Sequence, residues 1–195
     1  MKIAVIGSNG RSGKAFIKLA LKRGHEINAG VRNLKNHTNS DNLRYVLCDS
    51  RNKEQLLELI HDQDVIVSLI GHDRKSPHDL QTHTMQNLIE AMQELNMDRI
   101  VSLTGNGVRI ANDKYGIIDK FLNVSIKIID PNRIQDGITH YQILKDSNLN
   151  WTVLRVLKLT NGKPTRFSLS LHGPAKLLTP RDEVAEALLQ IIESF

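Results

Sequence analysis

The stretch Gly7-Ser8-Asn9-Gly10-Arg11-Ser12-Gly13 directly follows the short apolar run at residues 3–6. A helix-like segment at 13–22 comes next, and this order of strand, glycine-rich turn and helix is the context of a dinucleotide-binding fingerprint. Glycine allows a tight turn at position 7, close approach of a pyrophosphate at 10 and close packing of the helix at 13. The helix N-terminus would offer its N–H groups and positive dipole end to phosphates. We therefore predict that all seven residues hold a dinucleotide. The GxxGxxG spacing differs from GxGxxG, and a glycine-rich turn that binds nothing is the alternative.

The composition is typical of an ordinary globular protein. The 195 residues are 40% hydrophobic and 24% charged, which fits one domain over residues 1–195. No apolar run is long enough to cross a bilayer and no signal peptide is recognised, so we expect a cytoplasmic protein without membrane contact. Cys48 is the one cysteine, which excludes an internal disulfide and a cysteine-cluster metal site.

The net charge bears on the kind of partner. The formal net charge is +5 and the sequence pI is about 9.4, which suits nucleic acid, an anionic cofactor or an anionic substrate. The basic residues are dispersed, however, and only 4% of the residues are aromatic, so we expect no nucleic-acid binding. We interpret most of the charge as a solvated surface and expect a small-molecule substrate and a monomer or homodimer.

Strand-like and helix-like segments alternate through the first 155 residues. The expected strands are 3–6, 26–31, 45–47, 64–70, 100–104 and 151–156. The expected helices are 13–22, 53–61, 79–95 and 133–146. Such alternation predicts an α/β fold, a Rossmann-like doubly wound parallel sheet with three layers, α/β/α.

The alternation stops near the end of the chain. Glycines and prolines interrupt residues 160–174, which predicts a small C-terminal substrate lobe around 156–180. A closing helix follows, with Thr179 expected as its N-cap and Pro180 as its first residue. Earlier in the chain, the polar stretch 33–42 is expected to be a loop or a short helix.

The end of the second expected strand bears on the choice of cofactor. An NAD site usually carries Asp or Glu about 20 residues past the glycines, where it holds the ribose 2′-hydroxyl. No carboxylate occurs between residues 27 and 39, and Glu26 lies at the wrong end of the strand. Arg32 stands at the tip instead, with Arg11 and Lys35 nearby, and its guanidinium would pair with a 2′-phosphate. We therefore predict NADP(H) in preference to NAD(H); a solvated loop arginine is the alternative.

Further candidates follow the next three strands. Asp49-Ser50 comes after the third strand, where Asp49 would accept from the adenine amino group or either residue would cap the next helix. Both interpretations stay open. Ile70-Gly71 is expected beside the ribose and pyrophosphate, and Thr104-Gly105 beside the nicotinamide. Asn106 follows in a flexible loop and is a candidate substrate ligand.

The order of these motifs resembles the atypical short-chain dehydrogenase/reductase families. The nearest likeness is to the NAD(P)H-binding group that contains biliverdin reductase B/flavin reductase and the NmrA-like proteins, and it covers nearly the whole chain. The segments that carry it are 7–13, Gly30-Val31-Arg32, Cys48-Asp49, 99–105, 151–155, Leu159-Thr160-Asn161-Gly162 and 181–185. The resemblance implies NADPH binding, often with reduction of flavins, quinones or tetrapyrroles. Some members sense the nucleotide or regulate partners instead.

Two departures from that group concern the substrate side. Many members have Ser-Ser where this chain has Thr104-Gly105, so the serine hydroxyl expected near the nicotinamide is missing or replaced by Thr104. The family usually has Arg-Pro where this chain has Arg155-Val156, so Val156 is expected to give the substrate pocket a different shape.

Tyr141 and Lys145 fit the Tyr-x-x-x-Lys spacing of typical short-chain dehydrogenases, in which the ammonium lowers the phenol pKa. Here the helix ends directly after Lys145, so the pair would lie at the wrong end, and we interpret the spacing as coincidence. Tyr141 is thus, like Thr104, a weak catalytic candidate. His72, His78 and His83 lack the spacing of a helical metal site and are expected to be exposed, with no metal bound.

Three functional hypotheses follow. The first is an NADPH-dependent reductase that passes hydride directly to flavins, quinones or similar flat aromatic acceptors, where orientation supplies the catalytic gain and solvent the proton. The second is an NADP(H)-binding sensor or regulator without turnover. An epimerase or dehydratase of sugar nucleotides is the least favoured, because that chemistry needs the proton-transfer tyrosine.

Overall fold

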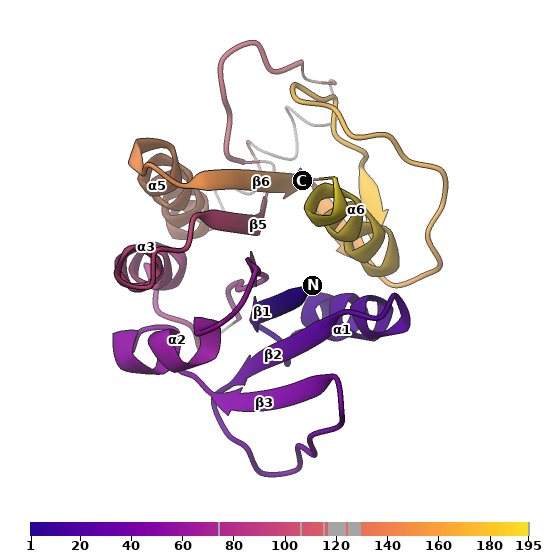
Figure 1. The fold of residues 1–195 in the computed structure, drawn as a ribbon. Coiled ribbons are helices and arrows are strands. Elements are labelled where there is room, and N and C mark those ends of the chain that lie inside the picture. Colours follow the sequence, from indigo (N-terminus) through magenta and orange to yellow (C-terminus); the bar gives the residue numbers. More distant parts are fainter. Residues whose placement is uncertain (74, 106, 115, 117–123, 125–129, 195) are drawn as a thin grey trace.

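The computed structural model describes residues 1–195 except 74, 106, 115, 117–123, 125–129 and 195. Six parallel strands form one sheet in the order β3-β2-β1-β4-β5-β6 (Figure 1). In chain order the elements are β1 (Lys2–Ile6), α1 (Arg11–Lys22), β2 (Glu26–Val31), β3 (Leu43–Leu47), α2 (Lys53–Ile60), β4 (Val65–Ser68), α3 (Leu80–Glu94), β5 (Arg99–Gly105), α5 (Pro131–Asp146), β6 (Asn150–Val156), β7 (Lys158–Thr160), β8 (Leu178–Pro180) and α6 (Arg181–Glu193). The predicted doubly wound sheet is confirmed.

Helices cover both faces of this sheet. Figure 1 shows α1 and α6 on one face and α2, α3 and α5 on the other. Alternate residues of β1 serve the two cores: Ile3 and Val5 belong to the cluster with α1 and α6, whereas Ala4 and Ile6 belong to the cluster with α2 and α3. The central strands are apolar throughout because both of their faces are buried. Among the described helices, none has the length and apolar character needed to cross a membrane.

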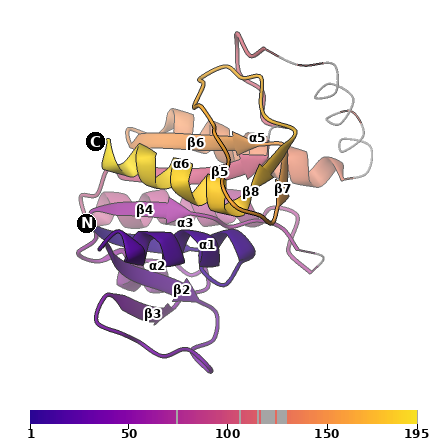
Figure 2. The same ribbon diagram turned by 90° about the vertical axis from the view of Figure 1, so that its right-hand side faces the viewer.

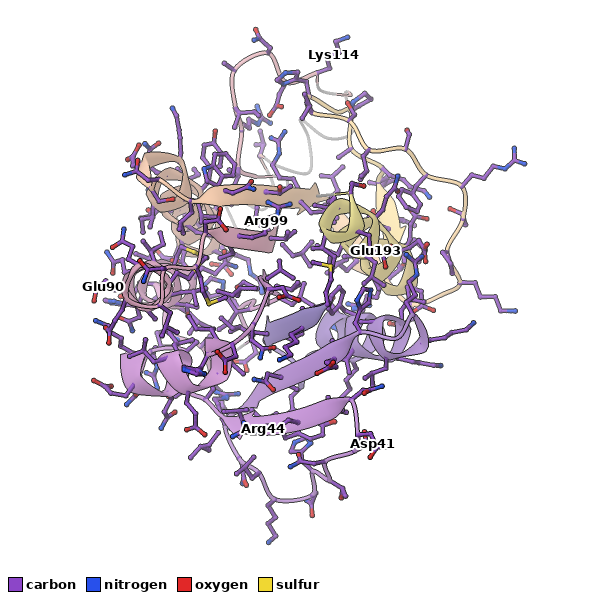
Figure 3. All side chains as sticks on the ribbon, viewed as in Figure 1. Asp41, Arg44, Glu90, Arg99, Lys114 and Glu193 are labelled. Atoms are coloured by element: carbon purple, nitrogen blue, oxygen red, sulfur yellow. The ribbon has the colours of Figure 1, made fainter. Side chains whose placement is uncertain are left out.

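Ion pairs hold α6 against α1. Arg23, the C-cap of α1, pairs with Glu186 and with Glu193, the latter at 2.6 Å. The Glu193 carboxylate also lies 2.9 Å from His25 Nε2, and Figure 3 labels this residue on α6. The helix that follows the glycine-rich turn is therefore fixed to the last helix of the chain.

The structure corrects three helix starts. Helix α1 begins at Arg11, two residues before the predicted start at Gly13, because Gly10 is its N-cap. Helix α5 begins at Pro131 because the Asp130 carboxylate accepts a hydrogen bond from the Arg133 N–H, at 3.1 Å. The prediction for α6 was wrong: Thr179 lies in β8, where it pairs with β7, and Pro180 is the N-cap, without a side-chain hydrogen bond.

The segment around 156–180 forms an extension that is tied to the loop after β5. Strands β7 and β8 pair as a small parallel sheet within it (Figure 2). Arg155, in β6, donates to both Asp113 carboxylate oxygens (2.5 and 2.8 Å) and to the Leu171 carbonyl (3.2 Å). The Lys114 N–H, at the outer tip in Figure 3, donates to the His172 carbonyl at 2.7 Å. One arginine thus anchors both segments beside the carboxyl ends of β5 and β6.

Candidate functional site

The glycine-rich turn lies at the carboxyl end of β1, which pairs with β2 on one side and with β4 on the other, so the strand order reverses here. Such a switch point is where ligands bind in doubly wound sheets. Gly7 has φ +80°, and a Cβ there would lie 2.7 Å from the Leu69 carbonyl oxygen. A Cβ on Gly13 would lie 2.3 Å from the Gly7 carbonyl oxygen. Both positions therefore require glycine, which keeps the turn tight against the β4 end and against the first turn of α1.

The N-terminus of α1 is suited to an anion. Gly10 is the N-cap and carries no side-chain cap, and no acidic residue lies in the first turn of the helix. The Gly10 N–H donates to the Gly7 carbonyl at 3.0 Å, which shapes the turn itself. Helix N–H groups without a capping side chain, together with the dipole, favour a phosphate. The predicted phosphate cradle fits this geometry.

The end of β2 lies beside the same turn. Ser8 Oγ donates to the Gly30 carbonyl at 2.5 Å, and Asn9 Nδ2 lies 3.3 Å from His37 Nε2. Arg32 is exposed at this end and lowers the pKa of Asp49 and of Asp73 by its positive charge, as a minor contribution in each case. It makes no hydrogen bond or ion pair with the part of the chain that the structure describes. Its guanidinium is therefore available to a ligand.

Neither residue of the Asp49-Ser50 pair caps α2, so that half of the prediction was wrong. Asn52 is the N-cap, and its side chain accepts from the Gln55 N–H at 2.9 Å. The Asp49 carboxylate is held by Arg51 (2.8 and 3.1 Å), which is the main reason its pKa is lowered. Ser50 is buried, with its Oγ 2.8 Å from that of Thr84. The adenine contact stays a prediction for Asp49.

Space is open beyond the ends of β4 and β5. A Cβ on Gly71 or on Gly105 would meet nothing within 4 Å. Thr104, by contrast, is buried, and a Cβ on Gly137 of α5 would lie 3.2 Å from its Oγ1. The structure thus brings the predicted Ile70-Gly71 and Thr104-Gly105 segments to one edge. Asn106 lies outside the described residues.

Two other candidates have side chains that are occupied by packing. Val156 is 8% exposed and belongs to the apolar cluster with α1 and α6. Tyr141 packs edge-on against Trp151, with ring centroids 5.8 Å apart. It lies one turn beyond Gly137, the residue of α5 that faces Thr104, and only five residues before the end of the helix. This placement favours coincidence as the origin of the Tyr-x-x-x-Lys spacing.

A buried polar network joins α3, α5 and β5, and sequence reasoning missed it. His140 Nε2 lies 3.1 Å from Ser102 Oγ, and Nδ1 lies 3.2 Å from Gln81 Oε1. The side-chain amide oxygen of Gln81 can only accept a hydrogen bond, so Nδ1 of His140 carries the proton. The Ser102 hydroxyl then donates to Nε2. Burial lowers the His140 pKa to about 4, so the imidazole is neutral in the folded protein. The pattern of the sequence held no signal for this pairing, because its partners come from three separate elements.

We expect this histidine to make the protein acid-sensitive. Its folded pKa of about 4 lies below its usual value of 6.5, so the unfolded chain binds the proton first. The unfolding free energy should therefore fall as the pH drops from 6.5 towards 4, by about 3 kcal/mol from this residue. Denaturant titrations across that range should show a clearly shallower pH slope for His140→Gln. Equal slopes for both proteins would exclude the assignment.

The prediction that the His72 side chain is exposed was wrong. His78 and His83 are exposed, as expected, but the His72 side chain is only 7% exposed and its Nε2 lies 3.0 Å from an Asp136 carboxylate oxygen. Asp136 also accepts from the Gln81 and Thr82 N–H groups, each at 2.8 Å. It thereby caps α3 from a different helix, since the side chain of Asp79, at the N-cap position, makes no capping hydrogen bond. Among the described residues, no group of three or more potential ligands could hold a metal ion.

Comparisons with known proteins bear on this site. A family model described as NAD(P)H-binding matches residues 7–194. An uncharacterized chloroplast protein of Arabidopsis thaliana is 25% identical over 180 residues, which cover 84% of this chain and 61% of that protein. A short-chain dehydrogenase/reductase from Veillonella parvula, solved in complex with NADP, superposes with a TM-score of 0.82 at 17% identity, covering 99% and 87% of the two chains. A candidate NADH-flavin reductase from Streptococcus pneumoniae gives 0.73 at 21% identity, covering 100% and 93%.

The two solved structures establish a shared fold at these identities. The chain spans 61% of the length of the Arabidopsis relative. The family model, in contrast, matches from the first glycine of the turn to the end of α6. On the strength of this match, the chain belongs to the NAD(P)H-binding family.

Proposed function

We propose that this protein binds NADP(H) across the carboxyl ends of β1, β2, β4 and β5 and reduces flat acceptors such as flavins or quinones. The observation that carries the proposal is the pair of features at one edge: a helix N-terminus without a capping side chain, and open space beyond Gly71 and Gly105. The first suits a diphosphate, and the second leaves room for a nicotinamide and a stacked ring. When bound, the reduced nicotinamide supplies the hydride.

The chain's own residues would then bind and orient. The N–H groups at the start of α1 hold phosphate, Arg32 holds the 2′-phosphate, and Gly71 and Gly105 allow close approach of two rings. Beside this space, Thr104 packs closely against Gly137 of α5. Holding two reactants in reactive geometry lowers the barrier by several kcal/mol, about 7–11 at best. The names of the NADP complex and of the candidate NADH-flavin reductase support this choice of chemistry.

Steady-state assays test the proposal directly. We expect loss of NADPH absorbance with FMN, riboflavin or a quinone, and direct binding of NADP(H) by calorimetry. Tight binding without turnover of any acceptor would favour the sensor or regulator instead. No heat at millimolar dinucleotide would remove both functions.

An Arg32→Glu variant tests the cofactor preference. The substitution replaces a fork donor by a carboxylate that repels the 2′-phosphate, so the NADPH-to-NADH affinity ratio should fall by about 100-fold. Lys18→Glu is the matched control, because Lys18 is exposed on α1 and the change in charge is the same. An unchanged ratio in the Arg32 variant would show that this residue does not read the phosphate. Both affinities are measured by calorimetry.

A further inference from the structure

The Asp136 carboxylate is a buried anion that holds an imidazole. Its side chain is 1% exposed and accepts from four donors: the Gln81 and Thr82 N–H groups at 2.8 Å, Thr82 Oγ1 at 2.5 Å and His72 Nε2 at 3.0 Å. Acceptance from so many donors keeps the carboxyl pKa below its usual value, despite the opposing effect of burial. Nε2 of His72 therefore carries a proton, and its hydrogen bond to Asp136 fixes the orientation of the ring.

The other ring nitrogen of His72, Nδ1, makes no hydrogen bond to the described residues, although it is buried. The residue is otherwise fully fixed, because Arg133 Nη2 donates to its carbonyl at 2.7 Å and the His78 carbonyl lies 3.3 Å from Nε2. A buried polar atom without a partner is costly, so a purely structural role leaves the imidazole unexplained.

Both residues of this pair are adjacent in the chain to glycines of the proposed site. His72 directly follows Gly71, beyond which space is open, and Nδ1 is the ring nitrogen nearer the main chain. Asp136 directly precedes Gly137, which faces Thr104. The histidine and its carboxylate are therefore neighbours of both segments that we assign to the nicotinamide half.

We propose that His72, oriented by Asp136, is the proton donor of this site. The inference rests on the proposed function and replaces solvent as the proton source for a quinone. Hydride, with its two electrons, adds to the quinone and leaves an anionic oxygen; this oxygen takes the proton from Nδ1 of the imidazolium. The imidazole is left neutral, with the proton on Nε2 still donated to Asp136, and Nδ1 regains a proton from water.

The charges that face His72 agree with this role. The hydrogen bond and the negative charge of Asp136 raise the His72 pKa, as does the His78 carbonyl, whereas burial and the positive charge of Arg133 oppose them. The net direction is upward, so the cation is favoured towards neutral pH. Turnover should then decline as the pH rises through the raised pKa.

His72→Gln tests the proposal, since the glutamine amide can still donate to Asp136 but carries no transferable proton. We expect kcat with a quinone to fall about 100-fold, the fall in rate at high pH to disappear, and KM for NADPH to change little. His83→Gln, on the exposed face of α3, is the matched control. Thermal unfolding checks that the variant is folded; if it is not, His72→Asn replaces it.

A second readout does not depend on turnover. Imidazole ¹⁵N NMR of the wild-type protein should show the His72 Nδ1 resonance and its pKa shifting when NADP⁺ and a hydroquinone are added together. The resonance is assigned by its absence from the spectrum of His72→Gln. A folded His72 variant with wild-type kcat and pH profile, or an Nδ1 signal that the ligands leave unchanged, overturns the proposal. A wild-type protein that reduces no acceptor overturns the proposed function and this inference with it.

Discussion

A Gly13→Ala variant is expected to lose NADP(H) binding, with an affinity at least about 100-fold lower. The new Cβ would lie 2.3 Å from the Gly7 carbonyl oxygen and 2.7 Å from that of Ser8, and both atoms belong to the main chain. A main-chain clash cannot be relieved by a side-chain rotation, so the turn must separate from α1. The N–H groups that we assign to the phosphate then move apart, and two or more charge-assisted hydrogen bonds to it are expected to be lost.

Calorimetry with NADP⁺ measures this loss, and thermal unfolding should show a lower midpoint as well. Gly116→Ala is the matched control, because a Cβ there would meet nothing within 4 Å and its φ is not positive. The control should bind normally. If Gly13→Ala also bound with wild-type affinity, the turn would not be the phosphate site.

An Asp136→Ala variant is expected to have the largest effect on stability. The substitution removes the cap of α3 and leaves the Gln81 and Thr82 donors and the His72 imidazole buried without their acceptor. Removing one partner of a buried, charged pair costs about 3–5 kcal/mol. Denaturant unfolding at neutral pH measures the change. A loss below about 1 kcal/mol would contradict the assigned role of the carboxylate.

The matched control is Asp146→Ala in the same helix, where the carboxylate is exposed and bonded only to Gln142 among the described residues. Its effect should be small. The sign of the pH dependence is a further check, because the folded pKa of Asp136 is lowered. Its contribution to stability is therefore present above the usual carboxyl pKa and is lost as the pH falls through the folded value.

The sequence alone determined the fold class and the position of the glycine-rich turn to which we assign the phosphate. Both follow from local patterns: apolar strands buried on two faces, and glycines where a Cβ would strike the main chain. A local pattern also indicated Arg32 at the exposed end of β2 and the missing carboxylate there. Such features need only neighbouring residues, so spacing and residue type suffice to predict them.

Tertiary structure alone decided which polar side chains meet. His72 was expected to be exposed, and Asp136 had no assigned role, yet α5 brings the carboxylate to α3 and to the loop after β4. The partners of Asp136 in α3 are 54 and 55 residues away in the chain, so no periodicity connects them. Thr179 was expected to cap α6, but its backbone pairs with β7 instead. Contacts between distant elements depend on how helices pack across the sheet, and that packing cannot be predicted from the sequence of any single segment.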